Sequence, residues 1–187
     1  MLTLFNSLVR SKLEYCCQLW SPTKIKLIDA LEQIQRSFTR RIDQMKDLPY
    51  WDRLKKLGIM SLQRRREKLI LLHTWKIKNY IVPNDINLEF KQNVRNLTVK
   101  AVLKPLPRVQ GKLLSSYENS FVIKAAKLWN KIPPRLAEIS NFNTFQSKLN
   151  KYLEHIPDYP PVHGIYHHTN NSILDHKNVS YESVFES

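Results

Sequence analysis

At 187 residues, 42% of them hydrophobic, the chain is long enough to bury the core of one domain, with or without an appendage. Its 30 Lys and Arg residues against 16 Asp and Glu give a formal net charge of +14, which makes nucleic acid the first partner to consider and an anionic membrane the second. The apolar residues form no transmembrane run, and charge follows Met1 too soon for a signal peptide. We therefore expect an intracellular protein, in nucleus and cytoplasm and not in a membrane, with Cys16 and Cys17 as reduced core thiols.

The first 82 residues are predicted to form a helical region. A first helix covers about 2–19, and Ser21 with Pro22 opens a second helix that extends to about Ile42. We expect one side of each helix to face the core. The apolar residues on these sides are Leu4, Leu8, Tyr15 and Leu19 in the first helix, and Leu27, Leu31, Ile34, Phe38 and Ile42 in the second.

Two further helices complete this region. A short helix near 48–57 should end at Gly58, because glycine readily takes the left-handed conformation that ends many helices. Ser61 can then cap a long helix that extends to about Tyr80. Its segment 69–77 is apolar nearly all round, so this helix should be central to the core.

The rest of the chain divides into three parts. Alternation of apolar and polar residues predicts an extended basic connector over 83–114, and helices at about 117–131 and 144–155 form a C-terminal helical pair within 115–156. Residues 157–187 are rich in Asn, Ser, His and Pro, which predicts a disordered tail. The expected fold class is mainly α, an irregular helical bundle with one extended basic segment and a disordered C-terminal tail.

Cations cluster at the start of the predicted long helix, where the helix dipole favours negative charge instead. A phosphate bound at this helix end would explain them, because backbone N–H groups and guanidinium groups would both bind it. The alternative is structural, with arginine stems covering apolar surface and their head groups pairing with acids such as Glu67. The residues concerned are Arg64, Arg65, Arg66 and Lys68.

Other cations are candidates for contacts with a nucleic-acid backbone. Arg36 and Arg40 lie one turn apart on the second helix and Arg41 follows, although Glu32, four residues before Arg36, is placed to neutralise part of this charge. Residues 1–155 hold 29 Lys and Arg against 12 Asp and Glu, so cations are in excess over the whole predicted body. The remaining candidates lie in the extended segment and in the helix that follows it: Lys100, Lys104, Arg108, Lys124, Lys127 and Lys131.

Tryptophan and histidine provide weaker signals. The four tryptophans each fall on or beside an apolar face, so core packing is favoured over base stacking; they are Trp20, Trp51, Trp75 and Trp129. Four histidines near the C-terminus have no cysteine nearby and no predicted structure to hold a metal, so we predict no metal and no cofactor; they are His163, His167, His168 and His176. The chain also lacks an Asp-Asp pair, so no two-metal catalytic site is predicted and no residue is assigned a catalytic role.

Four segments, in their order along the chain, resemble a known family. They are LVRSKLEYCCQLWSP at 8–22, QRSFTRRI at 35–42, YWDRLKKLGIMSLQRRRE at 50–67 and AAKLWNKIP at 125–133. Together they resemble the region downstream of the palm in reverse transcriptases of non-LTR (LINE-type) retrotransposons, especially the jockey-like group. The resemblance extends from about Leu2 to about Ile156. In that family this stretch is the thumb and a following helical region, and the metal-binding aspartates lie upstream in the palm.

The resemblance implies a nucleic-acid-binding C-terminal fragment of an RNA-directed DNA polymerase, without the catalytic palm and without enzymatic activity. It would hold template and primer, contacting RNA and single-stranded or hybrid DNA irrespective of sequence, with an upstream polymerase palm as a further partner. The alternative is a helical protein-interaction module that docks on a polymerase or on itself and binds no nucleic acid. A hydrolase that uses the C-terminal histidines and a module that binds membrane surfaces are weaker alternatives.

Overall fold

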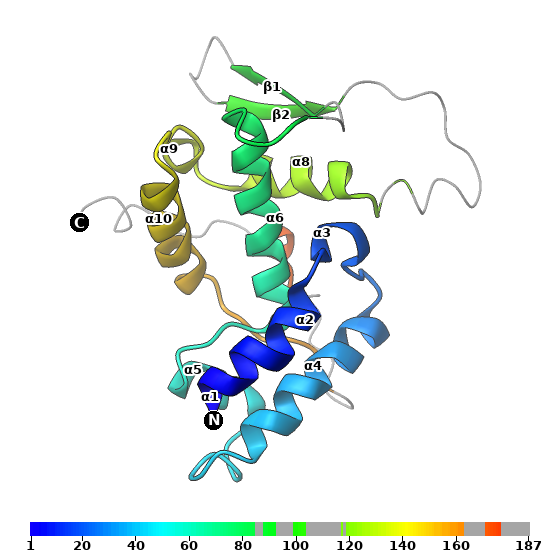
Figure 1. Ribbon diagram of the computed structural model, residues 1–187, viewed down its shortest axis with the longest axis vertical. Coiled ribbons are helices and arrows are strands. Elements are labelled where there is room, and N and C mark those ends of the chain that lie inside the picture. The colour runs from blue at the N-terminus through cyan, green and yellow to red at the C-terminus, as the bar shows by residue number, and fades with distance from the viewer. Residues whose placement is uncertain (85–87, 93–98, 104–116, 118, 163–170, 177–187) are drawn as a thin grey trace. The chain divides into compact units, whose positions relative to one another are not determined.

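The computed structural model describes residues 1–84, 88–92, 99–103, 117, 119–162 and 171–176. The described chain is mainly helical, as predicted, with a single two-stranded antiparallel sheet among these residues (Figure 1). It divides into two compact units, and the division differs from the predicted boundaries. Unit 1 comprises Met1–Glu67 and Pro157–Asp175, and unit 2 comprises Lys68–Ile156 and His176–Ser187. The boundary between Glu67 and Lys68 lies inside helix α6 (Leu62–Lys78).

The N-terminal segment of unit 1 is an irregular helix, where one regular helix over 2–19 was predicted. It consists of α1 (Leu2–Leu4), the π-helix η1 (Phe5–Arg10), α2 (Ser11–Glu14) and α3 (Cys17–Trp20). Cys16, between α2 and α3, has a left-handed φ of 48°. The wider π turn and this break change which side chains face inward, because both shift the positions that follow. Phe5 and Cys17 are buried, whereas the residues predicted to face the core are exposed: Leu4, Leu8, Tyr15 and Leu19.

Helix α4 (Ile25–Arg40) buries polar residues on its inner side. It begins at Ile25, after Lys24 at the N-cap position, and not at the predicted Ser21-Pro22. Its buried residues are Ile28, Glu32, Gln35 and Thr39, and we call the last three the polar seam of α4. Leu27 and Ile34, by contrast, are 54% and 40% exposed. The predicted inward orientation is therefore wrong at these two positions, because the polar seam has hydrogen-bond partners inside unit 1.

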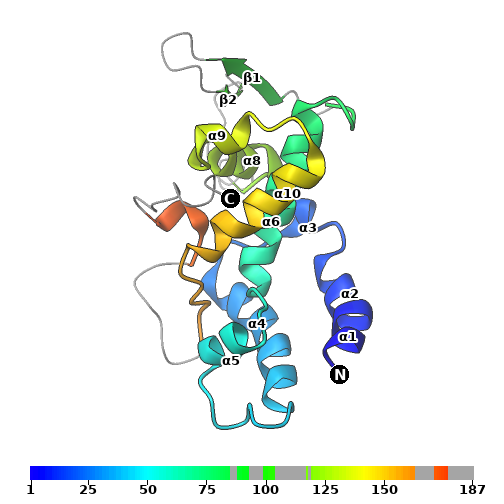
Figure 2. The same ribbon diagram turned by 90° about the vertical axis from the view of Figure 1, so that its left-hand side faces the viewer.

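Gly58 and Ser61 correctly predicted where the next helix ends and where α6 begins. Helix α5 (Tyr50–Lys56) lies beside α4 (Figure 2) and ends before Gly58, whose φ is 61°. Ser61 Oγ accepts a hydrogen bond from the backbone N–H of Arg64 at 3.1 Å, as expected for the N-cap of α6. Both predictions, the stop at Gly58 and the cap at Ser61, are confirmed.

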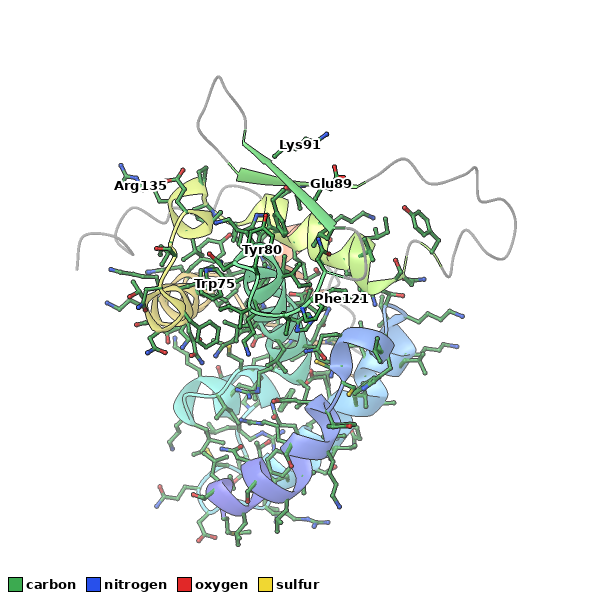
Figure 3. The ribbon with its side chains drawn as sticks, turned by 45° about the horizontal axis from the view of Figure 1, so that its top comes forward. Trp75, Tyr80, Glu89, Lys91, Phe121 and Arg135 are labelled. Carbon is green, nitrogen blue, oxygen red and sulfur yellow. The ribbon has the colours of Figure 1, made fainter. Side chains whose placement is uncertain are left out.

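Two tryptophans organise the core of unit 2. Trp75 of α6 packs against Phe142 and Phe145 of α10 (Phe142–Glu154), and its indole N–H donates to the Ile139 carbonyl at 2.7 Å. Figure 3 shows its side chain among the helices of this unit. Trp129 of α8 (Phe121–Lys131) also packs against Phe145. Core packing is thus confirmed for Trp75 and Trp129, which are 2% and 1% exposed. The prediction is wrong for Trp20 of unit 1, which is 41% exposed, and Trp51 is half-buried.

The predicted extended segment contains a β-hairpin in its described part. Strand β1 (Leu88–Gln92) pairs antiparallel with β2 (Val99–Leu103), with Phe90 opposite Ala101. The side chain of Asn130 on α8 accepts from the Ala101 N–H at 2.9 Å and donates to the Ala101 carbonyl at 3.0 Å. This side-chain amide therefore satisfies backbone groups of β2 as a further strand would. Residues 93–98 and 104–116 lie outside the described residues.

The predicted disordered tail is ordered where it is described. Residues 157–162 and 171–176 are folded within their units, and they include the 3₁₀ helix η2 (Ile173–Asp175). Asp158 accepts hydrogen bonds from the backbone N–H and the hydroxyl of Ser61, each at 2.7 Å. Composition did not predict this order because the stabilising partners are about one hundred residues away in sequence. Residues 163–170 and 177–187 of the predicted tail lie outside the described residues.

We expect Phe145→Ala to lower the free energy of unfolding by about 3–5 kcal/mol, since Phe145 is 0% exposed and contacts both core tryptophans. Urea denaturation monitored by tryptophan fluorescence measures this loss. Phe145→Leu, which keeps much of the volume, should lose clearly less. A loss below about 1 kcal/mol for Phe145→Ala would mean that the core of unit 2 is not packed as described.

Candidate nucleic-acid interface

The N-terminal end of α6 is bound by carboxylates of the chain itself. Glu32 is 0% exposed, and it accepts hydrogen bonds from the backbone N–H of Gln63 and from the Tyr50 hydroxyl, both at 2.8 Å. Asp158 accepts from the N–H of Ser61, as described above. These two carboxylates supply the negative charge that the helix dipole favours. The phosphate predicted for this helix end is therefore replaced by side chains from α4 and from the C-terminal segment.

Two of the three arginines at this end of α6 form hydrogen bonds or ion pairs within unit 1, and the third is buried. Arg64 is 0% exposed, and its Nη2 donates to the carbonyls of Pro157 and Asn171 at 3.0 and 3.2 Å. Arg65 is half-buried and forms a two-point ion pair with Glu14. Arg66 is 1% exposed, and burial lowers the pKa of its guanidinium.

The structural alternative thus describes this cluster better than a phosphate-binding surface does. Lys68, the fourth candidate of the cluster, is half-buried and belongs to unit 2.

Two buried carboxyl groups of unit 1 have raised pKa values. Burial raises the pKa of Glu32 from its ordinary value of 4.5 to about 7, opposed by the hydrogen bonds from Tyr50 and Gln63. Burial also raises the pKa of Glu67 to about 6, opposed by the nearby charge of Arg64 and by hydrogen bonds from Ser172 and Ile173. Both groups therefore change protonation between mildly acidic and neutral pH.

These shifts predict that unit 1 loses stability as pH rises. Since the folded-state pKa of Glu32 lies above its unfolded value, the stabilisation is fully present below pH 4.5 and is lost as pH rises through about 7. Glu67 contributes with the same sign up to about pH 6. We expect the free energy of unfolding to fall by about 1–3 kcal/mol between about pH 5 and pH 8. Urea denaturation across this pH range measures the change.

Glu32→Gln should flatten much of this dependence, because the amide keeps an acceptor oxygen and does not titrate. Glu154→Gln, at an exposed position at the end of α10, is the matched control and should leave the pH dependence unchanged. A Glu32→Gln protein that retains the full pH dependence of the original chain would rule out this carboxyl group as its source.

Cations of α4 and α5 converge on a cleft within unit 1. The cleft has a volume of about 300 Å³, and we call it the α4–α5 cleft. Its cationic side chains are Arg36, Arg40, Lys46 and Arg53, and none of the described residues that line it is an Asp or a Glu. The remaining lining residues are Gln33, Ser37, Leu48, Pro49, Tyr50, Trp51 and Val162.

Tyr50 organises the arginines of this cleft. The guanidinium carbons of Arg36 and Arg53 lie 5.5 and 5.6 Å from the centroid of its ring, within the range of cation–π attraction. Arg36 also donates through Nη2 to Asp29 at 2.6 Å and to the Pro161 carbonyl at 3.2 Å. The predicted partner of Arg36 was Glu32, which instead binds Tyr50 and Gln63.

Arg53 is the most unusual residue of the cleft, and the sequence did not single it out. It is 4% exposed, and its Nε and Nη1 have no hydrogen-bond partner among the residues that the structure describes. Burial lowers the pKa of Arg53, Tyr50 opposes this, and Arg40 and Arg36 lower it further. The one available signal was its position three residues after Tyr50, which places both on one face of a short helix.

A second hollow adjoins the end of α4. It has a volume of about 560 Å³ and shares Arg40 and Lys46 with the α4–α5 cleft. Arg41 and Asp43 also line it, and Arg40, Arg41 and Lys46 are exposed. Of the candidates at this end of α4, Arg40 and Arg41 are therefore accessible to a polyanion, whereas the side chain of Arg36 is 13% exposed and lines the cleft.

The other candidate cations lie in unit 2 or outside the described residues. On α8, Lys127 is exposed, and Lys124 and Lys131 are half-buried. Lys100 belongs to β2, but its side chain is not among those described, and Lys104 and Arg108 lie outside the described residues. On the hairpin, the side chain of Lys91 is 67% exposed and points outward, as does that of Arg135 on α9 (Pro134–Ala137) (Figure 3).

The described residues offer neither a membrane span nor a metal site. None of the described helices is long and apolar enough to cross a membrane. Within the same residues, no group of three or more His, Cys, Asp or Glu side chains is arranged to hold a metal ion. Of the four C-terminal histidines, His176 alone lies in a described segment.

Comparisons of the chain with protein-family models, curated protein sequences and solved structures found no match.

Proposed function

We propose that this chain binds nucleic acid through its phosphate groups, without sequence specificity, and that the α4–α5 cleft and the end of α4 are the binding surface in unit 1. The observation that carries the proposal is the convergence of four cationic side chains on a cleft whose described lining includes no carboxylate. Arginine forks match the geometry of phosphate oxygens, and a cleft focuses the field of the charges around it.

The accessible cations favour a polyanion as the partner. Arg40, Arg41 and Lys46 are exposed at one end of α4, and none of them forms an ion pair with a described residue. Neutralising such charges releases counterions from a nucleic acid, which gives affinity without sequence discrimination. The overall net charge of +14 acts in the same direction, because it attracts any polyanion to the chain.

The resemblance of the four segments supports a more specific proposal. The chain is the thumb and C-terminal helical region of a retrotransposon RNA-directed DNA polymerase, and it grips template RNA and single-stranded or hybrid DNA. It carries no Asp-Asp pair, so its role is binding and not catalysis. An upstream polymerase palm is then a natural partner, in the nucleus and the cytoplasm.

Salt dependence tests the binding surface. The logarithm of affinity for a single-stranded oligonucleotide should fall steeply with the logarithm of salt concentration. Replacing Arg40, Arg41 and Lys46 together by Gln should reduce this slope by about two to three units, if each contacts phosphate. Fluorescence anisotropy with labelled RNA and DNA over a range of salt concentrations measures the slope.

The matched control removes the same number of charges elsewhere in unit 1. Lys12, Lys24 and Lys26 are exposed, and two of them lie at the opposite end of α4. Their replacement by Gln should change the slope by less than one unit. Equal slopes for the two triple variants would mean that net charge alone drives binding. No binding of RNA or DNA by the original chain, even at low salt, would overturn the nucleic-acid proposal.

A second candidate function is supported by exposed apolar side chains in unit 1. Met1, Leu4 and Leu8 in the first helical segment are 72%, 63% and 62% exposed, and Leu27 and Ile34 are exposed on α4. Clusters of such residues mark protein-interaction sites. They favour docking on a polymerase or on a second copy of the chain. Sedimentation velocity at increasing concentration tests self-association, which Leu4→Ser with Leu8→Ser should reduce.

A further inference from the structure

Arg53 is a buried cation that lines the α4–α5 cleft. A buried guanidinium group in a folded protein is ordinarily paired with acids or carbonyls, because unpaired buried charge is strongly unfavourable. Arg64 of the same unit has two carbonyl acceptors for its Nη2, although its Nε and Nη1 also lack partners among the described residues. Arg53 has no ion pair with a described carboxylate, its Nε and Nη1 lack acceptors among the described residues, and it lines a cleft.

The positive charges around Arg53 make its unpaired charge still less favourable unless an anion binds. Arg36 and Arg40 both act on it with like charge, and Lys46 lines the same cleft. Arg36 keeps a partner in Asp29, but its Nε is also buried without a hydrogen bond to any described residue. Several N–H donors and three further positive charges thus line one cleft, and its described lining residues include no Asp or Glu.

The size and the lining of the cleft select the ligand. Its volume of about 300 Å³ is at the lower end of the range of ligand sites, roughly 300–1,000 Å³, so a small anionic group fits and a whole duplex does not. A phosphate group presents more charge and more acceptor oxygens than a carboxylate does, which suits several arginines better than one. Leu48, Pro49 and Trp51 form an apolar wall beside the cations, suited to the sugar or base attached to that phosphate.

We propose that the α4–α5 cleft is a specific site for one phosphate group of a nucleic acid, with Nε and Nη1 of Arg53 as the buried donors and Arg36, Arg40 and Lys46 around it. This inference rests on the proposed function for the identity of the ligand, and the pocket can be tested separately. The phosphate is either a terminal 5′-phosphate or an internal phosphodiester. The cleft thus fixes the position of the strand, whereas the exposed cations at the end of α4 contribute affinity.

The primary test is calorimetric titration of the full chain with inorganic phosphate at low salt. We expect saturable binding of one phosphate per chain. Arg53→Gln should weaken it by about tenfold or more, the cost of losing a charge-assisted hydrogen bond. Arg53→Lys should weaken it nearly as much, because lysine keeps the charge and loses the fork. Lys55→Gln with Lys56→Gln is the matched control, since both lysines are exposed on α5 and neither lines the cleft.

Arg40→Gln keeps the test decisive if substitution of buried Arg53 prevents folding. Arg40 is exposed, so its replacement should leave the thermal unfolding midpoint unchanged while weakening phosphate binding severalfold. Two results would overturn the proposal: absence of saturable phosphate binding by the original chain, or equal phosphate affinities for the original chain, Arg40→Gln and every folded variant of Arg53.

Short oligonucleotides identify the source of the phosphate and separate this inference from the proposed function. A trinucleotide with a 5′-phosphate that binds more tightly than its 5′-hydroxyl form assigns the cleft to a chain end, and equal, Arg53-dependent binding assigns it to the backbone. Salt-dependent oligonucleotide binding that Arg53 and Arg40 do not affect would overturn the pocket and leave nucleic-acid binding intact. Phosphate binding that depends on Arg53 without any oligonucleotide binding would confirm the pocket and overturn its nucleic-acid ligand.

Discussion

Burial of the Glu32 carboxyl group is the constraint on which unit 1 depends. This group links α4 to α5 through the Tyr50 hydroxyl and to α6 through the Gln63 N–H, and it is 0% exposed. An acid buried so completely is costly unless its hydrogen bonds are satisfied or it is protonated, and both conditions apply near neutral pH. The polar seam of α4 must therefore face inward, which leaves Leu27 and Ile34 at the surface.

The same interaction shapes the α4–α5 cleft. Glu32 and Gln35 hold the Tyr50 hydroxyl, at 2.8 and 3.2 Å, so the position of the Tyr50 ring is determined from its buried end. Its face then lies against the guanidinium groups of Arg36 and Arg53. Tyr50 thus belongs both to the hydrogen-bond network that stabilises the fold and to the cluster of cations that suits an anion. Rigid placement of such a cluster reduces the entropic cost of binding a ligand.

The C-terminal segment completes the N-terminal end of α6. Asp158 and Asn171 bind Ser61 and each other, and Glu67 binds the backbone N–H of Ile173. Unit 1 therefore needs residues from both ends of the described chain. The N–H groups at the start of α6 donate to acidic side chains that come from two distant segments. Arg64 donates to two carbonyl groups and Arg65 pairs with Glu14, so part of the charge that looks unfavourable along the sequence is balanced in the folded state.

The sequence by itself determined the features that depend on neighbouring residues. The stop at Gly58 and the cap at Ser61 were predictable, because each rests on interactions within a few turns of chain. The core position of Trp75 was predictable from the apolar stretch around it, although its packing partners lie on α10. Tertiary structure alone decided which charges are buried. Arg64 and Arg66 look like a binding cluster in the sequence, yet both are buried in the fold. The sequence does not single out Arg53, and only the packing of α4 and Tyr50 around it makes it a buried cation that lines a cleft. The physical reason is that the free energy of a charge depends on the groups packed around it, and those come from segments that local pattern does not relate.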